Sequence, residues 1–277
     1  MDIASLREGL ASALGGWLAT DANNRLGLTT VVFVIYYASC NAYWIFKARG
    51  NSPLRKLRRI AGLDAIDEAI GRCTEMGRPV LYNLGMDGLS SSTFASLAIL
   101  SYVAIRVVRY DTRMITVTRY ASVLPVAENT VRQSYVEGGK PDGFRIEDVR
   151  FLTSDQFGFA SGILGITVRE SVAANLMFGY YYAESLIFAE AGFESGAIQI
   201  AGTNNNSQTP FFIPACDYCL LGEELFAASA YLSKDRIRTA TLVAQDLGKL
   251  FIAVLMGLGV IFTTFGSNVI QNLMTLF

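Results

Sequence analysis

A stretch rich in glycine and hydroxyl residues, from Leu84 to Thr93, has the residue types that bind anions. It follows a short apolar run and precedes a helical pattern. Ligands of open parallel sheets bind at such strand-to-helix turns, where backbone N–H groups at a helix N-terminus attract negative charge. The residues placed to contact a nucleotide or another small anionic ligand are Gly85, Asp87, Gly88, Ser90, Ser91, Ser92 and Thr93.

Helix capping explains the same residues without a ligand. Serine and threonine are preferred at helix N-caps because their oxygens accept hydrogen bonds from the first unpaired backbone N–H groups. The stretch also lacks the G-x-x-x-x-G-K-[ST] and G-x-G-x-x-G spacings of nucleotide-binding loops. We therefore favour capping and keep ligand binding as the alternative.

Cys216 and Cys219 form a lone C-x-x-C pair. A tetrahedral zinc site needs four ligands, and the chain has neither a second such pair nor any histidine. A redox role requires Cys216 to begin a helix, since a helix N-terminus lowers the pKa of a thiol. Packing of small side chains is the favoured interpretation. With Cys40 and Cys73 the four cysteines give no disulfide framework, so we expect a reduced, cytosolic setting.

Acidic and amide residues add no catalytic spacing. Without histidine the chain lacks the commonest general base near neutral pH and the usual partner of a nucleophilic serine or cysteine. Solvated helix faces or salt bridges between subunits are the favoured interpretation of Glu184, Glu190, Glu194, Glu223 and Glu224. The polar run Gly202–Gln208 is predicted to be a loop, with a subunit contact or a polar ligand as alternatives. We predict no catalytic residue, no metal ion and no cofactor.

The elements that position these residues alternate between strand and helix. Short apolar runs predict strands at Val80–Leu84, Met114–Thr118, Val149–Leu152, Asn175–Tyr180, Ala197–Ala201 and Phe211–Pro214. Helical patterns lie at Ser92–Arg109, Ser122–Glu137, Gln156–Glu170, Glu184–Glu194 and Cys216–Leu232. Such alternation predicts an α/β fold with a mostly parallel, Rossmann-like sheet and helices on both faces. Phe94–Ile105 is almost wholly apolar but too short for a membrane span, which favours a buried helix of the domain.

Two apolar runs bracket this domain, Leu28–Phe46 and Leu250–Ile270, each close to the ~20 residues that cross a bilayer. They predict an N-terminal and a C-terminal transmembrane helix. The expected division is 1–27 amphipathic segment, 28–46 transmembrane helix, 47–249 cytoplasmic α/β domain, 250–270 transmembrane helix and 271–277 short tail.

Charge sets the expected orientation of these anchors. Basic residues such as Lys47 and Arg49 follow the first run, and Arg236, Arg238 and Lys249 precede the second. Because short basic flanks stay cytoplasmic, we expect a two-pass protein of the cell membrane with both termini outside. No cleavable signal peptide is predicted. The net charge of −1 argues against nucleic acid as a partner.

Small and amide residues inside the apolar runs predict close helix packing, within one chain or between chains. An amide in lipid is expected to face a protein partner, and small residues four apart allow backbones to approach closely. The residues concerned are Ala38, Asn41, Ala42, Ala253, Gly257, Gly259 and Thr263.

Three stretches together resemble a known group of proteins: IAGLDAIDEAIGRCTEMGRPV at 60–80, FGFASGILGITVRE at 157–170, and AIQIAGTNNNSQTPFFIPACDYCLLGEELFAASAYLS at 197–233. They are similar to a family of uncharacterised bacterial and archaeal membrane proteins with two transmembrane anchors and unknown function. The resemblance implies no activity and no site residue. The chain departs from the family's pattern at Asn204-Asn205-Asn206 and at Cys219, so the C-x-x-C pair is not a family motif.

The sequence favours a non-catalytic, membrane-anchored structural subunit that assembles with copies or paralogues into an oligomeric ring or scaffold. The expected partners are the lipid bilayer and the chain itself or paralogous subunits, with no identified small-molecule ligand. The alternative is a membrane-tethered α/β domain that binds a nucleotide or small anionic ligand at the Gly/Ser loop after the first strand.

Overall fold

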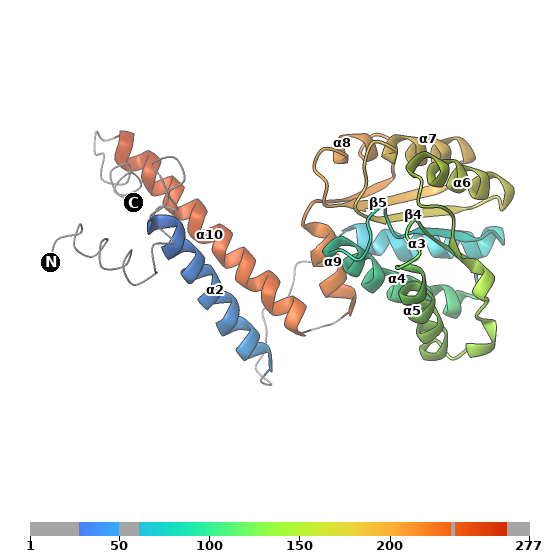
Figure 1. The fold of residues 1–277 in the computed structure, drawn as a ribbon, viewed down its shortest axis with the longest axis horizontal. Coiled ribbons are helices and arrows are strands. Elements are labelled where there is room, and N and C mark those ends of the chain that lie inside the picture. The colour runs from blue at the N-terminus through green and yellow to red at the C-terminus, as the bar shows by residue number, and fades with distance from the viewer. Residues whose placement is uncertain (1–27, 50–60, 234–235, 265–277) are drawn as a thin grey trace. The chain divides into compact units, whose positions relative to one another are not determined.

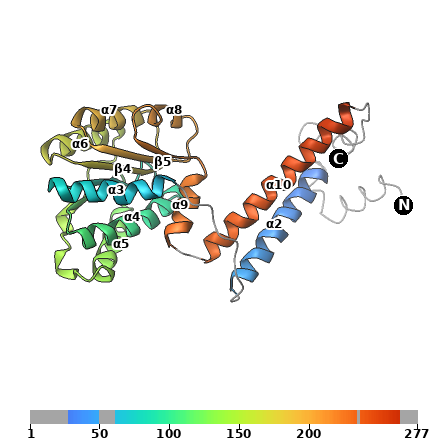
Figure 2. The same cartoon turned by 180° about the vertical axis from the view of Figure 1, so that it is seen from behind.

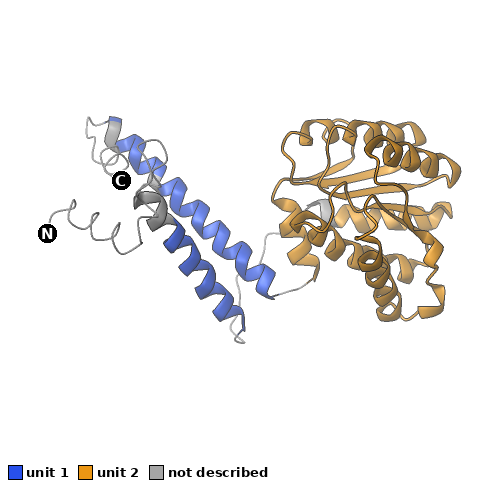
Figure 3. Ribbon diagram, viewed as in Figure 1, with its two compact units in different colours: residues 1–55, 236–277 blue, residues 56–235 orange. Residues whose placement is uncertain are grey.

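The computed structural model describes residues 28–49, 61–233 and 236–264. These residues belong to two compact units (Figure 3). Unit 1 comprises residues 1–55 and 236–277, and unit 2 comprises residues 56–235. The predicted amphipathic segment 1–27 and the tail 271–277 lie outside the described residues.

Unit 2 is an α/β domain built on one six-stranded, wholly parallel sheet, which confirms the predicted fold class of this part of the chain. The strand order is β3-β2-β1-β4-β5-β6, the order of doubly wound nucleotide-binding folds. The strands are β1 (Val80–Asn83), β2 (Met114–Thr118), β3 (Val149–Phe151), β4 (Ala174–Gly179), β5 (Ile198–Thr203) and β6 (Tyr218–Leu221).

Helices cover both faces of this sheet (Figures 1 and 2). One face carries α3 (Ala61–Met76), α4 (Ser91–Tyr110), α5 (Leu124–Glu137) and α9 (Glu224–Ser233). The other carries α6 (Gln156–Arg169), α7 (Ser185–Ser195) and α8 (Thr209–Phe212). Two 3-10 turns, Pro141–Gly143 and Ile146–Asp148, lead into β3.

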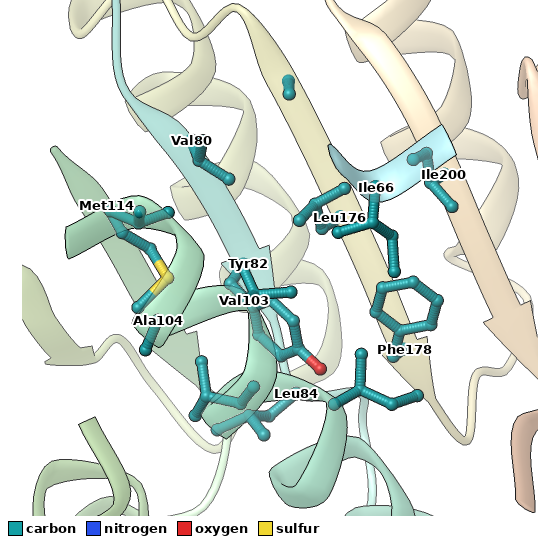
Figure 4. Close-up of a cluster of buried hydrophobic side chains, with 14 of the residues drawn as sticks. Ile66, Val80, Tyr82, Leu84, Val103, Ala104, Met114, Leu176, Phe178 and Ile200 are labelled. Atoms are coloured by element: carbon teal, nitrogen blue, oxygen red, sulfur yellow. The ribbon is translucent and has the colours of Figure 1, made fainter. Parts of the chain in front are cut away.

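Alternation along the strands divides the core into two clusters, because successive strand side chains point to opposite faces. In β1, Val80 and Tyr82 join the cluster under α3 and α4, whereas Leu81 joins the cluster under α6 and α7. Figure 4 shows the first cluster, in which Tyr82 lies near Phe178. The buried Tyr82 hydroxyl donates to the Ser96 carbonyl oxygen at 2.7 Å, so this polar group is satisfied within the core.

The apolar stretch Phe94–Ile105 lies in α4. In the most apolar 18-residue stretch of this helix, 61% of the residues are buried inside the protein. Among the residues whose side chains the structure describes, α4 and α10 (Arg236–Thr264) are long and apolar enough to cross a membrane, and those of the helix Leu28–Arg49 are described only from Val34 on. Burial against the sheet explains the composition of α4, in line with the interpretation of Phe94–Ile105 as a domain helix. In contrast, only 12% of the residues in the most apolar stretch of α10 are buried.

The last strand and helix of the domain differ from the prediction. Phe211–Pro214 is not a strand: α8 occupies Thr209–Phe212 and a turn follows it. Pro210 lies in the first turn of α8, where its missing N–H is not needed. The sixth strand is instead Tyr218–Leu221, so the predicted helix Cys216–Leu232 is shortened to Glu224–Ser233.

Unit 1 contains two long helices, α2 (Leu28–Arg49) and α10, which contact each other. The Tyr36 and Phe251 rings lie 4.8 Å apart between centroids. A Cβ built on Gly248 would lie 3.5 Å from the Tyr37 ring, an ordinary van der Waals contact, so Gly248 faces α2. The predicted runs 28–46 and 250–270 fall largely on these helices, although α10 begins fourteen residues before Leu250 as one continuous helix.

Candidate functional site

The switch point of the sheet lies between β1 and β4. The chain leaves β1 toward β2 and β4 toward β5, in opposite directions, and ligands of doubly wound folds bind in the crevice that this divergence opens. The predicted Gly/Ser loop follows β1 directly, so all of its candidate residues, from Gly85 to Thr93, lie at this edge. The loop after β4, from Tyr180 to Glu184, lies opposite.

The two loops are pressed together through a pair of glycines. Gly85 has φ +88° and Gly179 has φ +145°, backbone conformations that residues other than glycine rarely adopt. A Cβ on Gly179 would lie 2.6 Å from the Leu84 carbonyl oxygen, and one on Gly85 would lie 2.9 Å from the Tyr180 nitrogen. The glycines therefore bring backbone against backbone and leave no room for a phosphate between them.

Hydrogen bonds hold the two loops across the switch point. The Met86 N–H donates to the Tyr180 carbonyl oxygen at 2.8 Å. The Tyr181 hydroxyl donates to the Asn83 carbonyl oxygen at 3.2 Å, and the Tyr182 hydroxyl donates to Asp87 Oδ1 at 3.2 Å. The crevice is thus bridged by the protein's own groups.

Tyr181 fills the space behind these contacts. Its side chain is fully buried, and its ring packs edge-on against Phe188 and Phe212 at centroid distances of 5.9 Å and 5.3 Å. Burial raises the pKa of the Tyr181 hydroxyl well above its usual value, so this group stays protonated and acts as a hydrogen-bond donor. The Tyr181 ring therefore belongs to the core cluster under α6 and α7.

The hydroxyls of the Gly/Ser loop have three different roles. Ser90 is the N-cap of α4, with its oxygen accepting from the Thr93 N–H at 3.4 Å. Thr93 donates through its own hydroxyl to the Gly88 carbonyl oxygen at 2.6 Å, and Ser92 donates to Asn204 Oδ1 at 3.0 Å. Ser91 is exposed. Capping by Ser90 agrees with the favoured interpretation of the loop, whereas Ser92 is used in a tertiary contact.

The polar run after β5 also closes this edge. Asn205 Nδ2 donates to the Tyr181 carbonyl oxygen at 2.7 Å, and Asn204 accepts from Ser92 as described above. Ser185 at the start of α7 donates to Gln208 Oε1 at 2.7 Å. Gly202 and Thr203 end β5, and the rest of the predicted loop, residues 204–208, is a loop. Its amides connect the loops that follow β1 and β4.

Arg119, which follows β2, was not among the predicted site residues. Its guanidinium donates to the Met86 carbonyl oxygen at 3.2 Å and to the Ser154 carbonyl oxygen at 3.0 Å. These bonds tie the loops after β1, β2 and β3 together. Arginine and tyrosine side chains that act between distant loops leave no local pattern, so sequence spacing gave no signal for Arg119 or Tyr181.

The cysteine pair lies at the β6 edge of the sheet. The Cys216 N–H donates to the Phe212 carbonyl oxygen at 2.9 Å, so Cys216 follows α8 and does not begin a helix. The hydrogen bond to Cys219 and burial raise the pKa of the Cys216 thiol, and the same bond lowers the pKa of Cys219. Both side chains pack against the cluster under α6 and α7, as the packing interpretation expects.

The carboxylates do not gather into a site. Glu184 is buried and accepts hydrogen bonds from Gln156 Nε2 and, at 2.8 Å, from the Tyr182 N–H. Glu190 and Glu194 are exposed on α7. In the part of the chain that the structure describes, no group of three or more His, Cys, Asp or Glu side chains could hold a metal ion.

A cluster of four charged residues lies at the opposite, amino edge of the sheet. Arg113 pairs with Asp148 at 2.6 Å and with Glu170 at 2.8 Å, and Arg150 lies 3.4 Å from Glu170. The guanidinium of Arg113 lowers the pKa of Glu170, chiefly through its hydrogen bond. These four residues precede or begin β2, β3 and β4, so the cluster ties strand ends together.

The predicted small residues of unit 1 face outward where the structure describes them. Ala38, Ala42 and Ala253 are exposed, and a Cβ on Gly257 would meet no atom within 4 Å. Asn41 Nδ2 donates within its own helix, to the Tyr37 carbonyl oxygen at 2.8 Å. The glycine that faces α2 is Gly248, which the small-residue spacing did not single out.

For Gly259 the structure describes a partly exposed residue, and the Thr263 side chain lies outside the described residues.

The fold defines a doubly wound α/β protein in which the loops after β1 and β4 contact each other at the switch point. The chain belongs to the DUF6754 family, described as a domain of unknown function, which it matches over residues 20–274. The match agrees with the predicted resemblance to an uncharacterised family and includes both units. No curated protein and no solved structure matches the chain.

Proposed function

We propose that the chain is a non-catalytic, membrane-anchored structural subunit that assembles with copies or paralogues into an oligomeric ring or scaffold. The observation that carries the proposal is the apolar outer surface of unit 1. Val34, Ile35 and Phe46 on α2 are 61%, 63% and 70% exposed, and Met256 and Val260 on α10 are 62% and 68% exposed. A surface of this kind is covered by lipid or by another apolar partner.

The ends of the helices support the proposed orientation. Lys47 Nζ lies 4.7 Å from the centroid of the Trp44 ring near the end of α2. Tryptophan and lysine together are typical of the membrane–water interface, and Lys47 and Arg49 mark a cytoplasmic flank. In this proposal α2 and α10 each cross the bilayer, the α/β domain is cytoplasmic and both termini are outside.

The closed switch point supports a structural role over the ligand-binding alternative. Gly85 and Gly179 bring the two loops into backbone contact, and Tyr181 fills the space behind them. A phosphate placed between these two loops would have to separate them and break the hydrogen bond between Met86 and Tyr180. Saturable nucleotide binding by the purified wild type would favour the alternative.

Reporter fusions test the topology. Fusions at Met1 and at Phe277 are both expected to report the outer side, because the basic flanks lie on the domain side of each apolar run. A cytoplasmic signal from either end contradicts the proposed orientation.

The mass of the particle extracted in mild detergent tests the assembly. The wild type is expected to be an oligomer, and Gly257→Leu is expected to lower its mass, because Gly257 faces away from α2 and close backbone approach between chains depends on small residues. Gly248→Leu is the matched comparison: it crowds Tyr37 and forces apart α2 and α10 of the same chain. A monodisperse wild-type monomer contradicts the scaffold proposal.

A further inference from the structure

Both helical layers of unit 2 expose some large apolar side chains. On the layer of α3, α4, α5 and α9 these are Met76, Phe94, Tyr110, Val136 and Tyr231, and the other exposed residues of α5 are mostly polar. The layer made by α6, α7 and α8 exposes a larger set. These are Phe157, Leu164, Val168, Leu186, Ile187, Phe193, Phe211 and Ile213.

The sequence of α6 shows that this exposure belongs to a second apolar face. Phe159, Ile163 and Ile166 point into the core, whereas Phe157 and Val168 on the outside are 62% and 65% exposed. On α7, Phe188 is buried and Phe193 is 74% exposed. A helix that is apolar on both sides is typical of a helix covered on both sides.

The exposed apolar area is large enough for a stable interface. Eight side chains of roughly 150–200 Å² each, about half exposed, leave roughly 700 Å² of apolar surface. The largest apolar patch of a monomeric protein is usually about 300–600 Å². A standard interface buries about 800 Å² on each partner. Because α6 contacts α7 and α7 contacts α8, these residues lie on neighbouring helices of one layer.

Charge indicates what covers this face. From Ser171 to Ser233 the chain has no lysine or arginine, so the face has little attraction for anionic lipid head groups. Its charged residues are Glu190 and Glu194 on α7 and Arg169 at the end of α6. The negative carboxylates of α7 are therefore complementary in charge to the positive Arg169 of α6.

The positions of these charges fit a two-fold contact. Helices α6 and α7 each join parallel strands, so they run in the same direction, and Ala174 and Ile198, the first residues of the strands that follow, are paired. Arg169 and Glu194 consequently lie at the same level, near the amino edge of the sheet. A two-fold axis along the helices places α6 of each copy on α7 of the other and makes the Arg169–Glu194 contact twice.

We propose that a second copy of this chain docks on the outer face of α6, α7 and α8, with α6 of each copy against α7 of the other. This inference rests on the proposed assembly and names the cytoplasmic surface that makes it. The apolar side chains supply the buried area, and the two Arg169–Glu194 pairs set the register.

The test compares charged substitutions on the two layers in the full chain, extracted in mild detergent. Phe193→Glu and Val168→Glu are expected to reduce the particle mass to half or less. Val136→Glu is the matched control, since Val136 is 53% exposed on the other layer, and it is expected to leave the mass unchanged.

Charge reversal tests the register separately. Arg169→Glu or Glu194→Arg alone is expected to shift the particle toward the smaller species, and the double variant is expected to restore the wild-type mass. An oligomer that keeps its mass in all of the four single variants of this face overturns this inference and leaves the proposed assembly standing. These variants are Phe193→Glu, Val168→Glu, Arg169→Glu and Glu194→Arg. A monomeric wild type contradicts both. A particle with an unlike protein bound at this face also overturns the inference.

Discussion

Gly179→Ala probes whether the loops at the switch point are in contact. The added methyl would lie 2.6 Å from the Leu84 carbonyl oxygen and 2.9 Å from the Gly85 Cα, both backbone atoms that cannot move aside alone. Overpacking of this kind costs about 1–3 kcal/mol. The φ of +145° adds about 1–3 kcal/mol for any residue with a side chain.

The two terms together predict a loss of about 2–6 kcal/mol, a large part of the ~5–15 kcal/mol that stabilises a typical domain. With an m-value of about 2–3 kcal/mol/M in urea, the unfolding midpoint falls by roughly 1–3 M. Urea unfolding of the detergent-solubilised chain, followed by pulse proteolysis, measures this shift. Tryptophan fluorescence is unsuitable because Trp17 and Trp44 both lie outside unit 2.

Gly77→Ala is the control for this experiment. Gly77 also has a positive φ, +62°, but a Cβ there would meet no atom within 4 Å. The control therefore carries only the conformational loss of about 1–2 kcal/mol. If Gly179→Ala destabilises the protein no more than Gly77→Ala, the loops are apart and the reasoning that closes the crevice is refuted.

The remaining predictions concern the cap, the charged cluster and a buried thiol. Ser90→Ala is expected to lower the free energy of unfolding by about 1 kcal/mol and Ser91→Ala to leave it unchanged, as measured by urea unfolding, because only Ser90 caps α4. Arg113 lowers the pKa of Glu170, so their pairing stabilises the fold above the unfolded pKa of a glutamate and is lost as the pH falls through the lower folded value. Unfolding at several pH values is therefore expected to show that Arg113→Met destabilises the protein more at pH 7 than at acidic pH; an equal loss at both would contradict this. Burial raises the pKa of Cys73 to about 12, so mass spectrometry after brief alkylation at neutral pH is expected to find this thiol unmodified.

The alternation of apolar runs and helical patterns predicted most of unit 2. Met114–Thr118 is a strand with the predicted bounds, because a continuous apolar run between charged residues has few alternatives once buried. The sixth strand was misplaced because Phe211–Pro214 is as apolar as Tyr218–Leu221, and only tertiary packing selects between them. Short apolar runs carry no period that separates helix from strand.

The sequence predicted the position of the Gly/Ser loop but not its contacts with the loops after β4 and β5. The Gly/Ser loop lies where the sequence put it, yet its closure depends on Gly179, Tyr181 and Asn205, about ninety residues or more away along the chain. No local pattern encodes a contact at that separation. Which serine caps α4 also depends on the residue at which the helix begins, and a shift of one position changes the answer.

The contact between α2 and α10 has a consequence for how unit 2 is held. The two helices pack together through Tyr36 and Phe251, and unit 2 is the whole segment of chain between them. While that contact lasts, an unfolded unit 2 is a closed loop with fewer conformations than a free chain. The loop-closure estimate for a segment this long is roughly 5 kcal/mol, as for a disulfide joining its ends. The helix pair would thus act as a non-covalent cross-link between the ends of unit 2. Weakening the contact between α2 and α10 would lower the free energy of unfolding of unit 2 without changing any residue of that unit.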